Sequence, residues 1–196
     1  MRLVLASASP ARAEVLRQIG LRFDVVPSGI VEDMVDSGDP GESVAALALR
    51  KARHVARSQR DALVVAADTV VVLDGEVLGK PADADDARNM LRRMAGRWHQ
   101  VASGLAVVDA RSGREASCHE VTLVRMADFS ADAIDGYVAT GEPLGKAGSY
   151  AIQGRGALLV ERISGCYFNV VGLPIARLVA LADAVGVDLM REAFWG

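Results

Sequence analysis

An apolar run in the first half of the chain is interrupted by two polar residues. Residues 63–67 predict a buried strand, Asp68 and Thr69 follow, and the apolar pattern then resumes. A buried carboxylate is unfavourable unless it is paired or used, because it loses its hydration. Asp74-Gly75 then predicts a tight type I′ turn, since both residues tolerate a positive φ. We expect this hairpin to bring Gly79-Lys80-Pro81 back towards Asp68.

Ahead of that run, the same patterns predict two strands and two helices. The strands are expected at residues 3–6 and 23–26, and the helices begin near Pro10 and Gly41. Lys51 falls on the apolar stripe of the second helix. A lysine there either snorkels at the edge of the core or points into a cleft. The pattern leaves both interpretations open.

The turn between the first strand and the first helix is rich in serine. Ser9 is a good N-cap and Pro10 suits the first helical position, while Ser7 precedes them and Arg12 lies in the first turn. The N–H groups and the dipole at a helix N-terminus favour an anion such as phosphate. The turn therefore predicts an anion site. The alternative is a capped helix with a surface arginine.

Helix and strand patterns continue to alternate beyond the hairpin. A glycine-rich loop without periodicity covers residues 140–150 and contains Glu142 and Lys146. The alternation favours an α/β protein with a mixed sheet, folded as a single domain over residues 1–196. The other expected elements are a helix at 83–94, a strand at 98–108 with a bend at Ser103-Gly104, a strand at 117–125, a short helix capped by Ser130, a strand at 158–163 and a last helix opening at Pro174.

Composition limits the class of protein. The 51% hydrophobic content suffices for a buried core, and the net charge of −3 argues against nucleic acid as a main partner. No window of about 18 apolar residues lacks charges, so we expect no transmembrane helix and no membrane partner. Cys118 and Cys166 are isolated, which predicts reduced thiols and a cytoplasmic protein. His54, His99 and His119 lack the spacing of zinc ligands.

Polar residues gather at strand ends and in glycine loops. Several cations with a few carboxylates form an inventory suited to a polyphosphate bound with a divalent metal. The sequence has no Walker A motif, no GxGxxG fingerprint and no nucleophile elbow. The residues alone therefore predict only a phosphate-handling α/β enzyme. The set comprises cations (Arg12, Lys51, Lys80, Lys146), carboxylates (Glu32, Asp68, Glu142) and hydroxyl or amide groups (Ser7, Thr69, Gln153).

Several motifs, in order along nearly the whole chain, resemble the Maf family of nucleoside triphosphate pyrophosphatases. They are LASASPAR (Leu5 to Arg12), AADTVV with LGKP (Ala66 to Pro81), and TGEPLGKAGSYAIQG with NVVGLP. The resemblance implies hydrolysis between the α and β phosphates, with Mg²⁺ or Mn²⁺ as cofactor. It also implies a twisted mixed β-sheet with flanking helices, in two lobes around a cleft, related in shape to the inosine triphosphatases. Family members are commonly homodimers.

The resemblance also implies a role for each matching residue. Asp68 would be the general base for the attacking water or a ligand of the metal, and both roles stay open. Because aspartate is ordinarily a weak base, we expect the metal to take part in activating that water. Glu32 would be a metal or water ligand, and Lys51 and Lys80 would stabilise charge on the phosphates. The substrate-binding residues would be Ser7, Arg12, Thr69, Lys146 and Gln153.

Gln153 favours the dTTP/UTP branch of the family. Its amide can both donate to and accept from the edge of thymine or uracil, whereas the 7-methyl-GTP branch usually has glutamate there. The alternatives are a 7-methyl-GTP or broad-specificity house-cleaning pyrophosphatase, and a nucleotide-binding regulator of cell division. Two positions depart from the family pattern. Ala11 stands where an arginine is frequent, which implies weaker phosphate binding, and Gly145 stands where an aspartate is usual.

Overall fold

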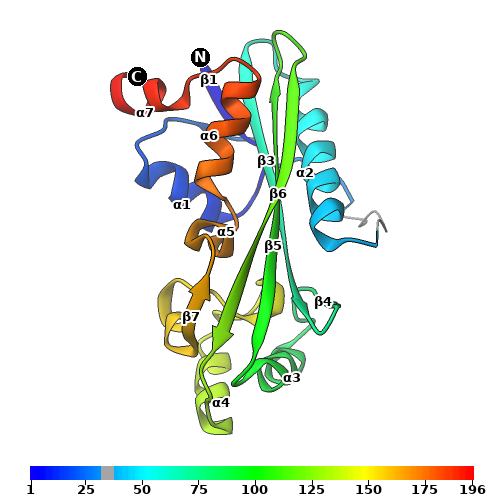
Figure 1. Ribbon diagram of the computed structural model, residues 1–196, viewed down its shortest axis with the longest axis vertical. Helices are drawn as coiled ribbons and strands as arrows, with labels where there is room; N and C mark the ends of the chain where they lie inside the picture. Colours follow the sequence, from blue (N-terminus) through cyan, green and yellow to red (C-terminus); the bar gives the residue numbers. More distant parts are fainter. Residues whose placement is uncertain (32–37) are drawn as a thin grey trace. The chain divides into compact units, whose positions relative to one another are not determined.

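The computed structural model describes residues 1–31 and 38–196 (Figure 1). Within these ranges the chain divides into two compact units. Unit 1 comprises Met1–Asp68, Ser103–Glu120 and Gly172–Gly196, and unit 2 comprises Thr69–Ala102 and Val121–Val171. The three long strands of the sheet each contribute residues to both units. We describe each unit by itself.

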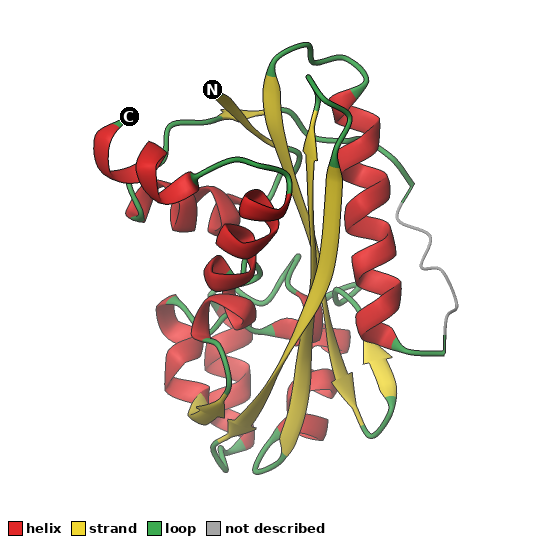
Figure 2. Cartoon of the chain, turned by 45° about the horizontal axis from the view of Figure 1, so that its top comes forward, coloured by secondary structure: helices red, strands yellow, loops and turns green. Residues whose placement is uncertain are grey.

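Helices and strands are interspersed along the chain (Figure 2). Two 3₁₀ helices, η1 and η2, lie in its second half. The elements are β1 (Arg2–Leu5), α1 (Pro10–Gln18), β2 (Asp24–Val25), α2 (Pro40–Ala56), β3 (Ala62–Leu73), β4 (Glu76–Leu78), α3 (Ala84–Met94), β5 (Trp98–Asp109), β6 (Glu115–Met126), α4 (Ala131–Ala139), η1 (Ala147–Ser149), η2 (Gly154–Leu159), β7 (Val160–Ser164), α5 (Tyr167–Val171), α6 (Ile175–Ala184) and α7 (Leu189–Trp195).

The strands form one mixed sheet. Its order is β2-β1-β3-β5-β6-β7, and β4 pairs with β3. Strand β1 runs parallel to both β2 and β3, whereas the pairs β3–β4 and β6–β7 are antiparallel. The predicted α/β class, a mixed sheet with flanking helices, is confirmed. The cleft expected between two lobes stays a prediction.

In unit 1, helix α2 covers one side of β1, β3 and β5. Asp39 caps the helix by accepting from the N–H of Gly41 (2.9 Å), and Pro40 occupies the first helical turn. Ala48, Ala52 and Val55 of α2 are buried against small apolar residues of the three strands. Helices α1 and α6 lie on the opposite side of these strands (Figures 1 and 2).

The close approach of α2 to the sheet depends on Gly104 of β5. A Cβ atom at this position would lie 2.1 Å from the backbone carbon and oxygen of Val44. The bend expected at Ser103-Gly104 is wrong, because β5 runs unbroken from Trp98 to Asp109. The glycine is needed for contact with a helix rather than for a change of strand direction.

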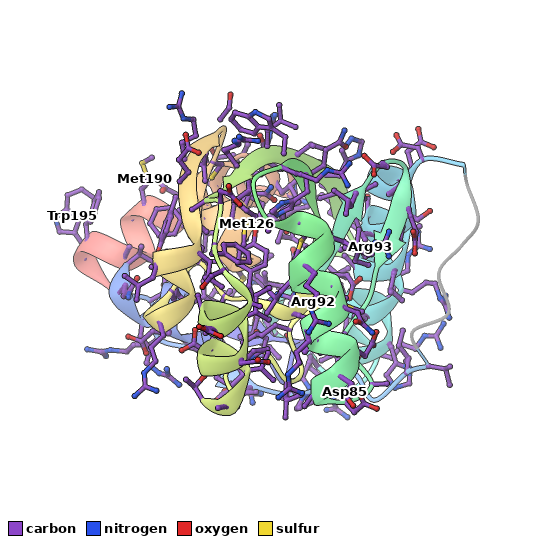
Figure 3. All side chains as sticks on the ribbon, turned by 90° about the horizontal axis from the view of Figure 1, so that it is seen from below. Asp85, Arg92, Arg93, Met126, Met190 and Trp195 are labelled. Carbon is purple, nitrogen blue, oxygen red and sulfur yellow. The ribbon has the colours of Figure 1, made fainter. Side chains whose placement is uncertain are left out.

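In unit 2, the second half of β3 packs with helices α3 and α4. The predicted hairpin is confirmed, since Asp74 and Gly75 have φ values of 53° and 83° and β4 pairs with the end of β3. Leu91 and Met94 of α3 are buried in this core. Helix α3 has acidic residues in its first turn and arginines in its last turn, which suits the helix dipole (Figure 3).

The C-terminal third differs from the predictions at three points. Leu158 and Leu159 lie in η2 rather than in a strand, so β7 begins only at Val160. Helix α5 was not expected, and the helix that follows Pro174 is not the last one. Helix α7 comes after it, and its Met190 and Trp195 side chains project into solvent (Figure 3). No helix of the described residues is long and apolar enough to cross a membrane.

Candidate functional site

The serine-rich turn after β1 holds Arg12 in a defined orientation. Ser9 caps α1 and accepts from the backbone N–H of Arg12 (3.5 Å). The Arg12 guanidinium donates from Nη1 to Ser7 Oγ (3.0 Å) and from Nε to the carbonyl of Gly172 (2.9 Å). These bonds place a cation over the turn, beside the N–H groups at the start of α1. The arrangement suits an anion and is not that of a loose surface arginine.

Lys51 and Asp68 form a buried ion pair within unit 1. Lys51 Nζ lies 2.7 Å from Asp68 Oδ1, and only 6% and 14% of the two side chains are exposed. Asp68 and Thr69 are the two half-buried residues of β3, whose other residues are buried. Lys51 therefore does not snorkel to the surface. The structure shows it paired with Asp68, and the alternative that it points into a cleft stays a prediction.

The turn follows β1, and Asp68 of the ion pair lies on the neighbouring strand β3. Leu5 of β1 is paired with Val65 of β3, and Ala6 donates its N–H to the Val65 carbonyl (2.7 Å). If the parallel register is continued past the end of β1, Ser7 lies opposite Ala67, which is the residue before Asp68 on β3. Paired strands lie about 4.8 Å apart. Unit 1 thus brings the backbones of Ser7 and Asp68 close together where β1 ends, with Lys51 supplied by α2 and Arg12 by α1, on opposite sides of the sheet.

Two predicted lysines of unit 2 lie on loops that are bonded to each other. The N–H of Gly148 donates to the carbonyl of Gly79 (3.0 Å), which connects the loop of Lys80 with the loop of Lys146. Gly148 has a φ of 67°, and a Cβ there would lie 2.8 Å from a methyl group of Val71. The loop therefore rests on β3 two residues beyond Thr69, and only glycine fits at that point.

Gln153 lies in a segment that Glu142 fixes. The Glu142 carboxylate accepts from the N–H groups of Arg155 (3.1 Å) and Gly156 (2.8 Å) and from the hydroxyl of Tyr137 (3.0 Å). Burial alone would raise the pKa of Glu142, but these hydrogen bonds outweigh it and the pKa is lowered. Glu142 belonged to the predicted polyphosphate-and-metal inventory, yet its oxygens bind the protein's own backbone.

The described residues offer few ligands for a divalent metal. No group of three His, Cys, Asp or Glu side chains in residues 1–31 and 38–196 could enclose an ion. Glu32, the other predicted ligand, lies outside the described residues. Mg²⁺ is commonly held by one or two carboxylates together with substrate phosphates and water. Asp68 fits that arrangement, in which the protein supplies only part of the coordination shell.

Sequence reasoning missed several polar groups in unit 2. Tyr137 lies in the short helix predicted after Ser130, and its hydroxyl is part of the Glu142 network. His99 and Tyr150 form a buried contact, with His99 Nε2 2.8 Å from the Tyr150 hydroxyl. Burial lowers the pKa of His99 to about 4, so this ring is neutral at pH 7. No spacing rule links these residues, because each pair joins separate elements.

Gly145, one of the two departures from the family pattern, occupies a turn that suits glycine. Its φ is 77°, in the left-handed region. An aspartate there would face a less favourable backbone conformation, although aspartate tolerates it better than most residues. The local fold therefore explains how the loop of Lys146 forms without the aspartate.

Comparison with known proteins places the chain among relatives of nearly equal length. It is 51% identical to a dTTP/UTP pyrophosphatase of Moorella thermoacetica, over 100% of this chain and 98% of the relative. A dTTP/UTP pyrophosphatase of Pelotomaculum thermopropionicum is 48% identical, over 96% and 98% of the two chains. The solved structure of the Staphylococcus aureus Ham1 protein covers 65% of this chain and 73% of its own, with 17% identity and a TM-score of 0.45.

The family comparison agrees with the motifs along the sequence. The family model described as "Maf-like protein" matches residues 2–185, which include every predicted site residue. The predicted resemblance is thereby confirmed. The chain belongs to the Maf-like protein family.

Proposed function

We propose that the protein is a pyrophosphatase that hydrolyses dTTP or UTP to the nucleoside monophosphate and pyrophosphate. The observation that carries the proposal is the buried Lys51–Asp68 pair beside the Ser7–Arg12 turn. It supplies a carboxylate together with preorganised cations, which polyphosphate hydrolysis requires. The relatives named dTTP/UTP pyrophosphatase support the substrate class. Gln153 supports a pyrimidine, because an amide matches the donor and acceptor edge of uracil or thymine.

In the proposed reaction, water adds to the triphosphate and the bridge between the α and β phosphates breaks. Asp68 accepts the proton of the water or holds the cation, and Lys51 and Lys80 stabilise the negative charge of the departing pyrophosphate. A bound Mg²⁺ or Mn²⁺ would draw electron density from the phosphate oxygens. Asp68 and Glu32 are the proposed protein ligands. The proposed substrate contacts come from Ser7, Arg12, Thr69, Lys146 and Gln153.

The test is a substrate panel with the purified protein and Mg²⁺ or Mn²⁺. We expect release of pyrophosphate rather than orthophosphate, with the highest kcat/KM for dTTP or UTP among dTTP, UTP, GTP and 7-methyl-GTP. A preference for a purine would contradict the argument from Gln153. Asp68→Asn should lower kcat by at least about a hundredfold. The matched control is Asp24→Asn, which changes an exposed aspartate of β2.

A metal titration of Asp68→Asn separates its two proposed roles. If Asp68 holds the cation, the Mg²⁺ concentration for half-maximal activity rises. If Asp68 accepts the proton, kcat stays low at saturating Mg²⁺ while that concentration is unchanged. Full activity under all conditions would remove Asp68 from the proposed machinery.

We also propose a homodimer in a reducing cytoplasm. The dimer is supported by the family resemblance, and the compartment by Cys118 and Cys166, both of which are free thiols. Light scattering on a size-exclusion column should give the mass of two chains. A monomer across micromolar concentrations would contradict the dimer.

A further inference from the structure

Glu142 holds the chain on the C-terminal side of Gln153. Its carboxylate accepts from two successive backbone N–H groups, those of Arg155 and Gly156, at 3.1 and 2.8 Å. The backbone of Glu142 is itself fixed, because its N–H donates to Thr140 Oγ1 (3.1 Å). A half-buried carboxylate bound in this way cannot move without leaving several polar groups unpaired.

Tyr137 holds the chain on the N-terminal side of Gln153. Its hydroxyl donates to Glu142 Oε1 (3.0 Å) and accepts from the N–H of Ala151 (3.2 Å). Burial is the main cause of a raised pKa of Tyr137, so the hydroxyl keeps its proton at neutral pH. Gln153 lies two residues after Ala151 and two residues before Arg155. Its backbone is thus fixed from both sides by two hydrogen-bonded side chains.

The glycines around Arg155 fit this arrangement. A Cβ on Gly154 would lie 2.8 Å from Glu142 Oε2, and the φ of Gly154 is 66°. A Cβ on Gly156 would lie 2.6 Å from the Tyr137 hydroxyl and 2.1 Å from the Ala151 carbonyl. A Cβ atom at either glycine would collide with the polar groups of Glu142 or Tyr137 that hold the segment. The segment and the two side chains are therefore shaped to each other.

We infer that Glu142 and Tyr137 are positioning residues that set the nucleobase preference of the enzyme by holding Gln153, an inference that rests on the proposed function. We call this pair the Glu142–Tyr137 clamp. Neither side chain is assigned a contact with substrate. A group that reads a base by hydrogen bonds must be held within a fraction of an ångström, and loops do this poorly unless other bonds support them.

The test compares Tyr137→Phe, Glu142→Gln and Gln153→Ala. We expect Tyr137→Phe to raise KM for the preferred pyrimidine triphosphate about tenfold, the effect of about 1.4 kcal/mol, with kcat unchanged within about twofold. The ratio of kcat/KM for that substrate to kcat/KM for GTP should fall by the same factor. Glu142→Gln should raise KM and lower this ratio in the same way, because the NH₂ group of the new glutamine side chain would face the backbone N–H donors. Tyr167→Phe and Glu161→Gln, at exposed positions, are the matched controls.

A double-variant comparison separates positioning from mere stability. If the clamp acts through Gln153, Tyr137→Phe should change the ratio no further in a Gln153→Ala background. Hydrogen exchange at the N–H groups of Ala151, Arg155 and Gly156 should speed up in Tyr137→Phe. A lower Tm with an unchanged ratio, or an equal effect in both backgrounds, would overturn the inference.

The outcomes also separate this inference from the proposed function. If the wild-type enzyme releases pyrophosphate from dTTP or UTP and the variants keep its preference, only the clamp fails. If the wild type prefers another triphosphate, the proposed substrate fails, and the same ratio then tests the clamp for that substrate. If the wild type hydrolyses no triphosphate, both fail.

Discussion

Replacing Lys51 or Asp68 in the wild type should destabilise the protein more than the same replacement does in a variant whose other member of the pair is already replaced. The two side chains are 6% and 14% exposed, and Nζ and Oδ1 are 2.7 Å apart. Lys51→Met leaves a carboxylate at a largely buried position without this cation. Asp68→Asn keeps a polar oxygen near Lys51 but removes the charge that balances it. Both single variants therefore leave a charge that has lost its main compensation.

The expected size follows from this burial. Removing one partner of a buried pair destabilises by about 3–5 kcal/mol, whereas removing both together is often close to neutral. For a chain of this length, 1 kcal/mol lowers Tm by about 2–4 °C. Each single variant should therefore melt about 6–20 °C below the wild type. The double variant should cost no more than either single change, so it should lose at least about 3 kcal/mol less than the sum of the two.

The assay is urea unfolding of the wild type, both single variants and the double variant, followed by circular dichroism. The matched control is the same cycle at Arg2 and Asp24, with Arg2→Met and Asp24→Asn. That pair is about half exposed, so its coupling should stay below about 1 kcal/mol. Equal coupling energies in the two cycles would refute the argument that burial makes Lys51 and Asp68 dependent on each other.

Three further predictions concern packing, pH and charge. Gly104→Ala should lower the free energy of unfolding by about 3 kcal/mol, because its Cβ meets the Val44 backbone, whereas Gly136→Ala, with open space on α4, should not destabilise. The pKa of His99 is lowered to about 4 in the folded state, from 6.5. As the pH falls, the unfolded state therefore binds this proton before the folded state does, and up to about 3 kcal/mol of stability should be lost between pH 6.5 and 4. His99→Gln should flatten that profile, with His54→Gln as its control. Lys80→Met should lower kcat about a hundredfold and leave Tm nearly unchanged, since Lys80 is exposed.

Much of the candidate site follows from short-range signals in the sequence. Asp68 and Thr69 stand out because they are polar within an apolar run, and the structure makes them the half-buried residues of β3. Asp74-Gly75 specifies a turn by its tolerance of positive φ, and that turn forms. Ser9 and Pro10 specify the start of α1. In each case the cause lies within a few residues, where sequence patterns are informative.

The parts that were missed depend on contacts between distant segments. The apolar residues Leu158 and Leu159 resemble a strand, but Glu142 binds the N–H groups of Arg155 and Gly156 and helps to fold the segment into a 3₁₀ helix. Gly104 looks like a strand irregularity until its contact with Val44 of α2 is known. Helix α7 is short and presents exposed apolar side chains, so it carries no amphipathic signal.

Two carboxylates that look equivalent in the sequence can have different roles, because different groups of the fold balance their charges. Asp68 and Glu142 were both carboxylates in or beside motifs of the same family. The charge of Asp68 is balanced by the ammonium group of Lys51. The charge of Glu142 is balanced by backbone N–H groups and a tyrosine hydroxyl, which are fixed dipoles of the fold. A carboxylate bound in the second way is suited to holding the chain in place, whereas one bound in the first way is suited to chemistry with cations and phosphates.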